Sequence, residues 1–207
     1  MADAIVNAYT QTYGGRSEVK LNGKQFWAYA GVDMRHESVS GLRERTMLMG
    51  PMQGNVMEDN IWQDGFINRY GTFAEFHIPF QKFQWIVAAR LDVNEADAGR
   101  ADERFASIQS EYASTHINPS FSSGLSREWN NALSAGVWLG RGVRSPNLSE
   151  RFINFLPIGL DPYELVGNPQ LSPEINNQLD LSLNLKKEKT QLALNLFASY
   201  MEDFITS

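Results

Sequence analysis

The sequence contains no cysteine, which excludes disulfide scaffolds, cysteine-based zinc sites and thiol catalysis. Basic residues are few as well: 18 Lys and Arg stand against 24 Asp and Glu, for a net charge of -6. This balance argues against a nucleic-acid-binding protein, which would present a basic stripe. No apolar run approaches the roughly 18 residues of a transmembrane helix. A membrane-spanning β-strand is still compatible with the sequence, because it needs only about ten alternating residues.

The sequence also lacks the local motifs of common enzymes. It has no Gly-x-Ser-x-Gly, no His-Glu-x-x-His and no phosphate-binding glycine loop, so we do not expect an enzyme. No secretory signal follows Met1, since a basic segment, an apolar core and a cleavage site are all missing. The last residues, 200–207, read as a strand that is still running. We therefore expect the 207 residues to be a segment of a longer chain.

Alternation with a period of two dominates what is present. Residues 175–185 form the clearest strand, with one polar face and an apolar face made of Ile175, Leu179, Leu181, Leu183 and Leu185. Residues 192–200 repeat the pattern after the charged segment 186–189. The two segments together predict a β-hairpin.

Three further hairpins follow from the same pattern. Their strands pair 15–21 with 25–37, 67–78 with 83–94, and 115–127 with 132–144. Their predicted turns are Asn22-Gly23-Lys24, Phe80-Gln81-Lys82 and Trp129-Asn130-Asn131; Asn-Gly between alternating runs is a particularly strong hairpin signal. The sequence thus predicts about eight strands in four hairpins.

The connections alternate between these tight turns and three long segments, 39–62, 96–111 and 145–173. Short turns at one end and large loops at the other are typical of bacterial outer-membrane barrels. The predicted strands often exceed ten residues, and aromatic residues flank several turns. We therefore predict an all-β fold, an antiparallel up-and-down meander of about eight long strands that forms an incomplete transmembrane β-barrel. A soluble β-sandwich binding module is the alternative, because it shows the same alternation.

The region 138–181 resembles the barrel domain of TonB-dependent outer-membrane receptors. It carries a Gly-Arg-Gly-x-Arg-x-Pro segment, then Glu-Arg-Phe, then a loop and Gly-Asn-Pro-x-Leu-x-Pro-Glu. Residues 154–155 and 161–166 are similar to the copper-receptor branch in particular. The positions that match the family pattern are Arg141, Arg144, Pro146, Glu150, Arg151, Phe152, Gly167, Asn168, Pro169, Leu171, Pro173 and Glu174.

The resemblance implies an energised transporter in the outer membrane of a Gram-negative bacterium. Its partners would be outer-membrane lipid, a TonB energy complex acting through a plug, and a metal or metal chelate, with no nucleic acid among them. No resident cofactor is expected, because copper or a ferric chelate would be the transported ligand. Nothing in residues 1–207 resembles the plug, the TonB-box or the aromatic-ended last strand. We therefore expect a middle portion of a barrel of about 22 strands.

Four of the seven methionines fall within one connection, at Met47, Met49, Met52 and Met57. Thioethers are soft ligands that select Cu(I), and Met-x-Met and Met-x-x-Met spacings let neighbouring sulfur atoms converge on one ion. His36 could add an imidazole. The alternative is that these methionines fill gaps in packing or contact a plug. Copper is favoured, and His77 and His116 are expected to be structural.

Two other expectations concern the loops. If the ligand is a ferric siderophore, aromatic side chains would hold it, and the candidates are Trp62, Phe66, Phe152, Phe155 and Tyr163. Charged side chains of the family motif are expected to form an ion-pair network that braces the loop; they are Arg141, Arg144, Glu150 and Arg151.

Overall fold

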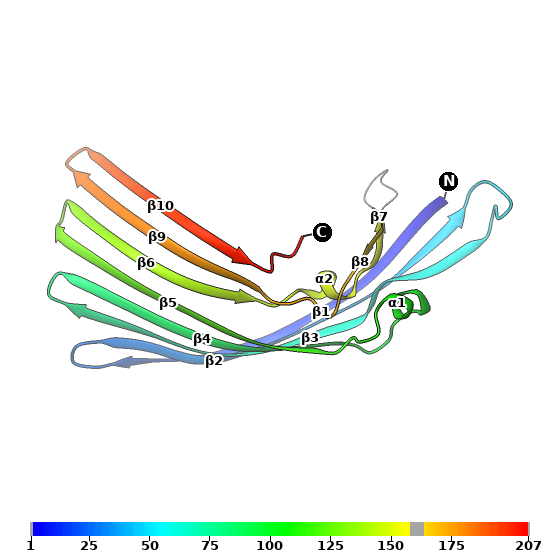
Figure 1. Cartoon of the computed structure of the whole chain (residues 1–207), viewed down its shortest axis with the longest axis horizontal. Helices are drawn as coiled ribbons and strands as arrows, with labels where there is room; N and C mark the ends of the chain where they lie inside the picture. Colours follow the sequence, from blue (N-terminus) through cyan, green and yellow to red (C-terminus); the bar gives the residue numbers. More distant parts are fainter. Residues whose placement is uncertain (1, 158–163, 207) are drawn as a thin grey trace.

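The chain folds into one long, curved, antiparallel sheet of eight strands. The computed structural model describes residues 2–157 and 164–206. The strand order is β1-β2-β3-β4-β5-β6-β9-β10, so each strand pairs with its neighbour along the chain. Figure 1 shows the sheet curving into an open trough, with β1 and β10 at its two edges. The strand bounds are β1 Ala2–Asn22, β2 Trp27–Met47, β3 Val56–Phe80, β4 Phe83–Ala98, β5 Ser114–Asn130, β6 Leu133–Arg144, β9 Glu174–Lys187 and β10 Thr190–Glu202.

Short turns join the strands at one end of the trough. Gln81-Lys82 and Glu188-Lys189 are two-residue turns, and Gln81 and Glu188 adopt the positive φ that such hairpins require. The turn after β5 lies at 131–132, slightly later than predicted, because the Asn130 side chain accepts hydrogen bonds from the backbone N–H groups of Ala132 (2.8 Å) and Leu133 (2.9 Å). The predicted hairpins are confirmed.

The other end carries the longer connections, where two short helices lie. They are α1, Glu103–Ile108, and α2, Leu148–Phe152. A small two-stranded sheet, β7 Asn154–Pro157 and β8 Glu164–Val166, follows α2. The predicted long connection 39–62 is wrong, since β2 and β3 continue to Met47 and from Val56. Neither described helix is long and apolar enough to cross a membrane.

The two faces of the sheet differ in chemistry. The concave face is the one on which Phe152 of α2 packs against Ile67 of β3, and the strand register assigns every other position to it or to the convex face. On the convex face, Val137, Leu181 and Leu196 lie in one row across β6, β9 and β10, and all three are exposed. The concave side of the same three strands carries polar residues such as Ser182 and Asn195.

A two-layer sandwich is excluded for the described residues, because nothing packs on this convex row. A small core exists only at the loop end of the concave face, where Phe105 and Phe152 pack on Ile67, Ala96 and Ala98. The fold is therefore that of an incomplete barrel wall, as the resemblance implies, and the β-sandwich alternative is wrong.

Candidate functional site

A charge cluster occupies the middle of the concave face. The guanidinium of Arg90 on β4 donates two parallel hydrogen bonds to Asp33 on β2, at 2.7 and 2.8 Å, and its Nε donates to Asp92 at 2.7 Å. Gly71 on the intervening strand permits this crossing, because a Cβ there would lie 2.1 Å from an Arg90 nitrogen. Bidentate pairing of this kind fixes geometry as well as charge.

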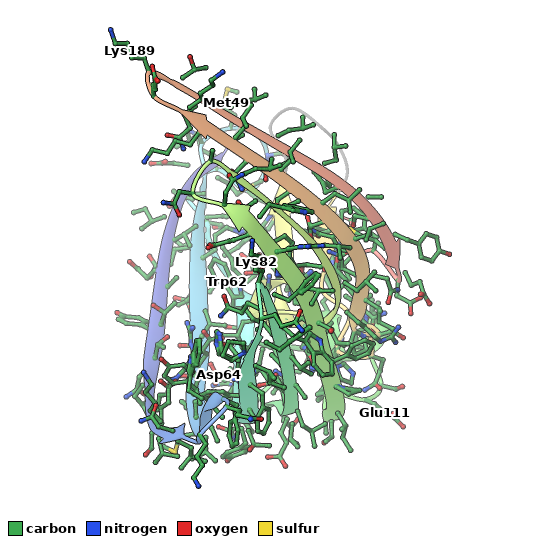
Figure 2. The ribbon with its side chains drawn as sticks, turned by 90° about the vertical axis from the view of Figure 1, so that its left-hand side faces the viewer. Met49, Trp62, Asp64, Lys82, Glu111 and Lys189 are labelled. Carbon is green, nitrogen blue, oxygen red and sulfur yellow. The ribbon has the colours of Figure 1, made fainter. Side chains whose placement is uncertain are left out.

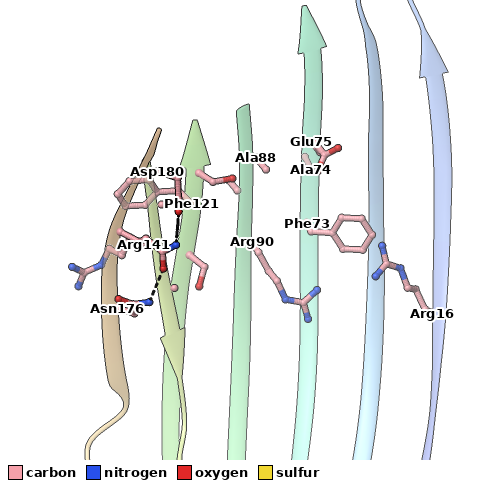
Figure 3. Close-up of a pocket in the computed structure, with 16 residues that line it drawn as sticks. Arg16, Phe73, Ala74, Glu75, Ala88, Arg90, Phe121, Arg141, Asn176 and Asp180 are labelled. Atoms are coloured by element: carbon pink, nitrogen blue, oxygen red, sulfur yellow. Dashed lines mark hydrogen bonds between the residues drawn. The ribbon is translucent and has the colours of Figure 1, made fainter. Parts of the chain in front are cut away.

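A shallow hollow of about 550 Å³ opens beside this cluster (Figure 3). Arg16 of β1 lies 4.2 Å above the Phe73 ring on one side of it, and Gln178 donates to Asp180 at 2.8 Å on the other. The wall of the hollow is thus polar and internally hydrogen-bonded. Such a surface suits water or another polar chain segment, and it holds no nucleophile paired with a base.

The family-motif residues build the loop end of the concave face. Asn147 caps α2, since its side chain accepts from the Glu150 N–H while the Glu150 carboxylate accepts from the Asn147 N–H, which is a capping box. Arg144, the last residue of β6, donates to Glu150 at 3.0 Å and to Glu174, the first residue of β9, at 2.6 Å. One guanidinium therefore ties β6, α2 and β9 together.

Arg151 does not join this ion-pair network, so that part of the expectation is wrong. Its side chain is fully buried and donates to the Pro146 carbonyl at 3.0 Å, to Asn94 at 2.9 Å and to the Ser114 hydroxyl. Burial lowers the pKa of Arg151 to about 10. Arg141 also lies outside the network, on the convex side of β6, where it donates to Asn177 at 3.2 Å.

Gly167 has a steric role next to Arg151. A Cβ at Gly167 would stand 2.5 Å from the Arg151 backbone carbon, and backbone cannot move aside as a flexible side chain can. The close approach allows the Gly167 N–H to donate to Ile153 at 2.7 Å and the Asn168 N–H to donate to Glu150 at 2.9 Å. Pro146 and Pro169 are fully buried in the same region. These motif residues are structural in their contacts.

The four methionines gather at the outer tip of the β2–β3 hairpin. Met47 ends β2, Met49 and Met52 lie in the turn, and Met57 is the second residue of β3. The turn is closed by hydrogen bonds between Met47 and the 54–55 backbone. Met49, Met52 and Met57 are 60%, 47% and 40% exposed, so they fill no core. Figure 2 shows Met49 well apart from Trp62.

His36 does not lie with the methionines. It precedes Met47 by eleven residues on β2, which is roughly 35 Å of extended strand. On the convex face it stacks on Tyr13 at 4.6 Å and shares a 2.7 Å hydrogen bond with Asn68. We therefore drop His36 as a ligand to the same ion. Among the side chains that the structure describes, no group of three His, Cys, Asp or Glu could hold a metal.

The aromatic residues proposed for a siderophore are scattered. Trp62 faces the α2 region and lines a hollow of about 820 Å³, with its indole N–H 3.4 Å from Ser149. Phe66 lies on the convex face against His36, and Phe152 is fully buried. The side chain of Phe155 and all of Tyr163 lie outside the described residues. Only Trp62 is placed to meet a ligand from the concave side.

Our reading of the sequence missed the concave-face cluster of Arg90, Asp33 and Asp92 and the buried Asn94. A signal was available for part of it. Arg90, Asp92 and Asn94 share one parity of a strand whose other parity is apolar, so they had to face the same way.

Comparison with known proteins gives two matches. Residues 3–207 match the family model described as TonB dependent receptor-like, beta-barrel. Among solved structures the chain is similar to the copper transporter OprC, with a TM-score of 0.76 and 17% identity, over 97% of this chain and 31% of that chain. At this identity the likeness shows the fold alone, and the chain spans under a third of the length of OprC. No curated protein matches.

Proposed function

The chain belongs to the TonB-dependent receptor β-barrel family, and on that premise we propose that it forms part of the wall of an outer-membrane receptor that takes up a scarce metal. The observation that carries the membrane placement is the convex face of β3. From Tyr70 to Phe80 its outward positions hold no charge, a run of about 34 Å along the strand. At a tilt of roughly 40° this spans about 26 Å, which matches the apolar band of such barrels.

The bacterial outer membrane is the location that this band and the family support. The loop end would face outward and the short turns inward, as the asymmetry of such barrels requires. A plug inside the trough, moved by a TonB energy complex, would admit the cargo. The polar concave face, with its hollow beside Arg90, suits contact with such a hydrated partner better than contact with lipid.

Copper is the cargo that we favour, with Met47, Met49, Met52 and Met57 as ligands. These four thioethers lie at the outer tip of one hairpin, and the three measured as exposed are available to an incoming ion. Soft sulfur ligands prefer Cu(I) over hard cations. The likeness to a protein named as a copper transporter supports the same choice, although that likeness is one of fold.

The test is a Cu(I) titration of the full-length receptor in detergent, with a competing chelator. A variant with all four methionines changed to Leu should bind Cu(I) at least tenfold more weakly. A matched control changes Met34 and Met201, which lie in β2 and β10 away from the hairpin tip, and should bind as the wild type does. Equal affinity in the four-leucine variant would overturn the copper assignment.

A ferric siderophore is the second candidate. It rests on Trp62, whose ring borders the 820 Å³ hollow between α2, β8 and the residues after β10. Iron chelates are bulky and often bind to aromatic surfaces. Saturable binding of a ferric siderophore that is lost in Trp62→Ala, together with unchanged Cu(I) affinity in the four-leucine variant, would favour this candidate over copper.

A further inference from the structure

A row of basic and amide side chains crosses the concave face just below α2. The strand register places Arg35, Arg69, Asn94 and His116 directly opposite one another on β2, β3, β4 and β5. Arg151 reaches this row from α2 and donates from Nη2 to the Asn94 side-chain oxygen at 2.9 Å. Directly opposed side chains have Cβ atoms about 5 Å apart. Arg69 and Arg151 therefore both lie beside the amide of Asn94.

Two of these guanidinium groups lack a carboxylate partner. Arg35 pairs with Glu37 on its own strand. Arg151 contacts only neutral groups, namely Pro146, Ser114, Asn94 and His116, and Glu150 is bound by Arg144 instead. Within residues 2–157 and 164–206, no acidic side chain lies in ion-pair contact with Arg69 or Arg151. After burial, the charge of Arg69 further lowers the pKa of Arg151, against the opposing effect of Glu150.

The amide of Asn94 adds a third unmet requirement. Asn94 is fully buried, and its Nδ2 has no hydrogen-bond partner among the described residues. Its orientation is fixed, because exchanging oxygen and nitrogen would bring the amide N–H groups against the Arg151 guanidinium. Arg151 also retains one N–H on Nη1 beyond the bonds named above. A buried donor without an acceptor is destabilising, so an acceptor is expected here.

We propose that Arg69, Arg151 and the Nδ2 of Asn94 form a binding site for one carboxylate on the concave face. A guanidinium presents parallel N–H groups that match the two oxygens of a carboxylate, and the amide supplies a further donor. A single negative charge would also relieve the repulsion between the two buried guanidinium groups. The carboxylate is either an Asp or Glu side chain from a part of the receptor beyond these residues or a free small carboxylate. The site does not depend on the identity of the transported metal.

The deciding experiment measures the sign of a stability change in the full-length receptor. If Arg69 and Arg151 only repel each other, Arg69→Gln removes the repulsion and raises the Tm. If a carboxylate couples them, Arg69→Gln lowers the Tm by several degrees, and Arg69→Lys, which keeps the charge, recovers part of the loss. Arg35→Gln is the matched control, because Arg35 lies in the same row with its own acidic partner, and it should change the Tm by less than Arg69→Gln.

Acetate distinguishes the two sources. At constant ionic strength, replacing chloride by acetate raises the Tm of the wild type, and not of Arg69→Gln, if the site takes a free carboxylate. If the receptor supplies the carboxylate itself, acetate has no effect, the Tm loss in Arg69→Gln persists, and a structure of the full-length receptor shows an acidic side chain at Arg69. An unchanged or raised Tm in Arg69→Gln would overturn the proposal in either form.

Discussion

Truncation of Arg151 should release α2 from the barrel wall. In Arg151→Ala the side-chain oxygen of Asn94 and the Pro146 carbonyl lose their donor while both residues stay buried. Unpaired buried groups cost about 1–3 kcal/mol each. Removing a guanidinium that lacks a carboxylate partner returns part of this. A net loss of about 3 kcal/mol is expected, which is on the order of a hundredfold in the opening equilibrium.

Hydrogen exchange on the full-length receptor measures this opening directly. The amides of Arg151, Ile153, Gly167 and Asn168 report on it, because their hydrogen bonds close α2 and its contact with the following loop. They should lose about a hundredfold of protection in Arg151→Ala, while amides of β9 and β10 keep theirs.

The control is Arg144→Gln. Arg144 is half exposed, and its ion pairs with Glu150 and Glu174 are expected to contribute less than about 1 kcal/mol each. Protection in this variant should fall by a few-fold. If Arg151→Ala loses no more protection than Arg144→Gln, the buried hydrogen bonds are not what holds α2, and the reasoning fails.

Two further predictions test the core and the two faces. Phe152→Ala removes a fully buried ring and should destabilise the α2 region by about 3–5 kcal/mol, read from the same amides; a loss below about 1 kcal/mol would show that the small core is dispensable. Leu181→Arg places a charge on the convex apolar row and should reduce the stability of the receptor refolded into lipid vesicles by about 2–4 kcal/mol, whereas the neighbouring Ser182→Arg should change it by far less. Equal effects at 181 and 182 would contradict the assignment of faces.

Strand alternation was predictable where one face is apolar, and it failed where both faces are polar. Residues 175–200 alternate openly, because one parity meets lipid in the proposed barrel. The ends of β2 and β3 were missed, since Arg43 lies opposite Asp59 and Glu44 opposite Glu58 there. Arg43 and Asp59 form an ion pair on one face of the ladder. Backbone pairing continues through such residues, but no hydrophobic period marks it.

The same limit applies to the candidate sites. The methionine cluster was visible because its members are neighbours in sequence, whereas His36 was added by nearness in sequence and lies far along the strand. The partners of Arg151 were not foreseeable. Asn94 and Ser114 are 57 and 37 residues away, and only sheet register together with the fold of the α2 loop brings them to the guanidinium.

The sequence by itself determined a two-faced antiparallel meander, because period-two alternation and turn residues act locally on neighbouring strands. It also determined which residues could offer soft sulfur ligands at one tip. Only the tertiary structure decided which charges meet. Arg90 found Asp33 across the Gly71 strand, and Arg151 was buried without a carboxylate beside Arg69. Curvature of the sheet and inward folding of the loops set these contacts, and neither is written in any single strand.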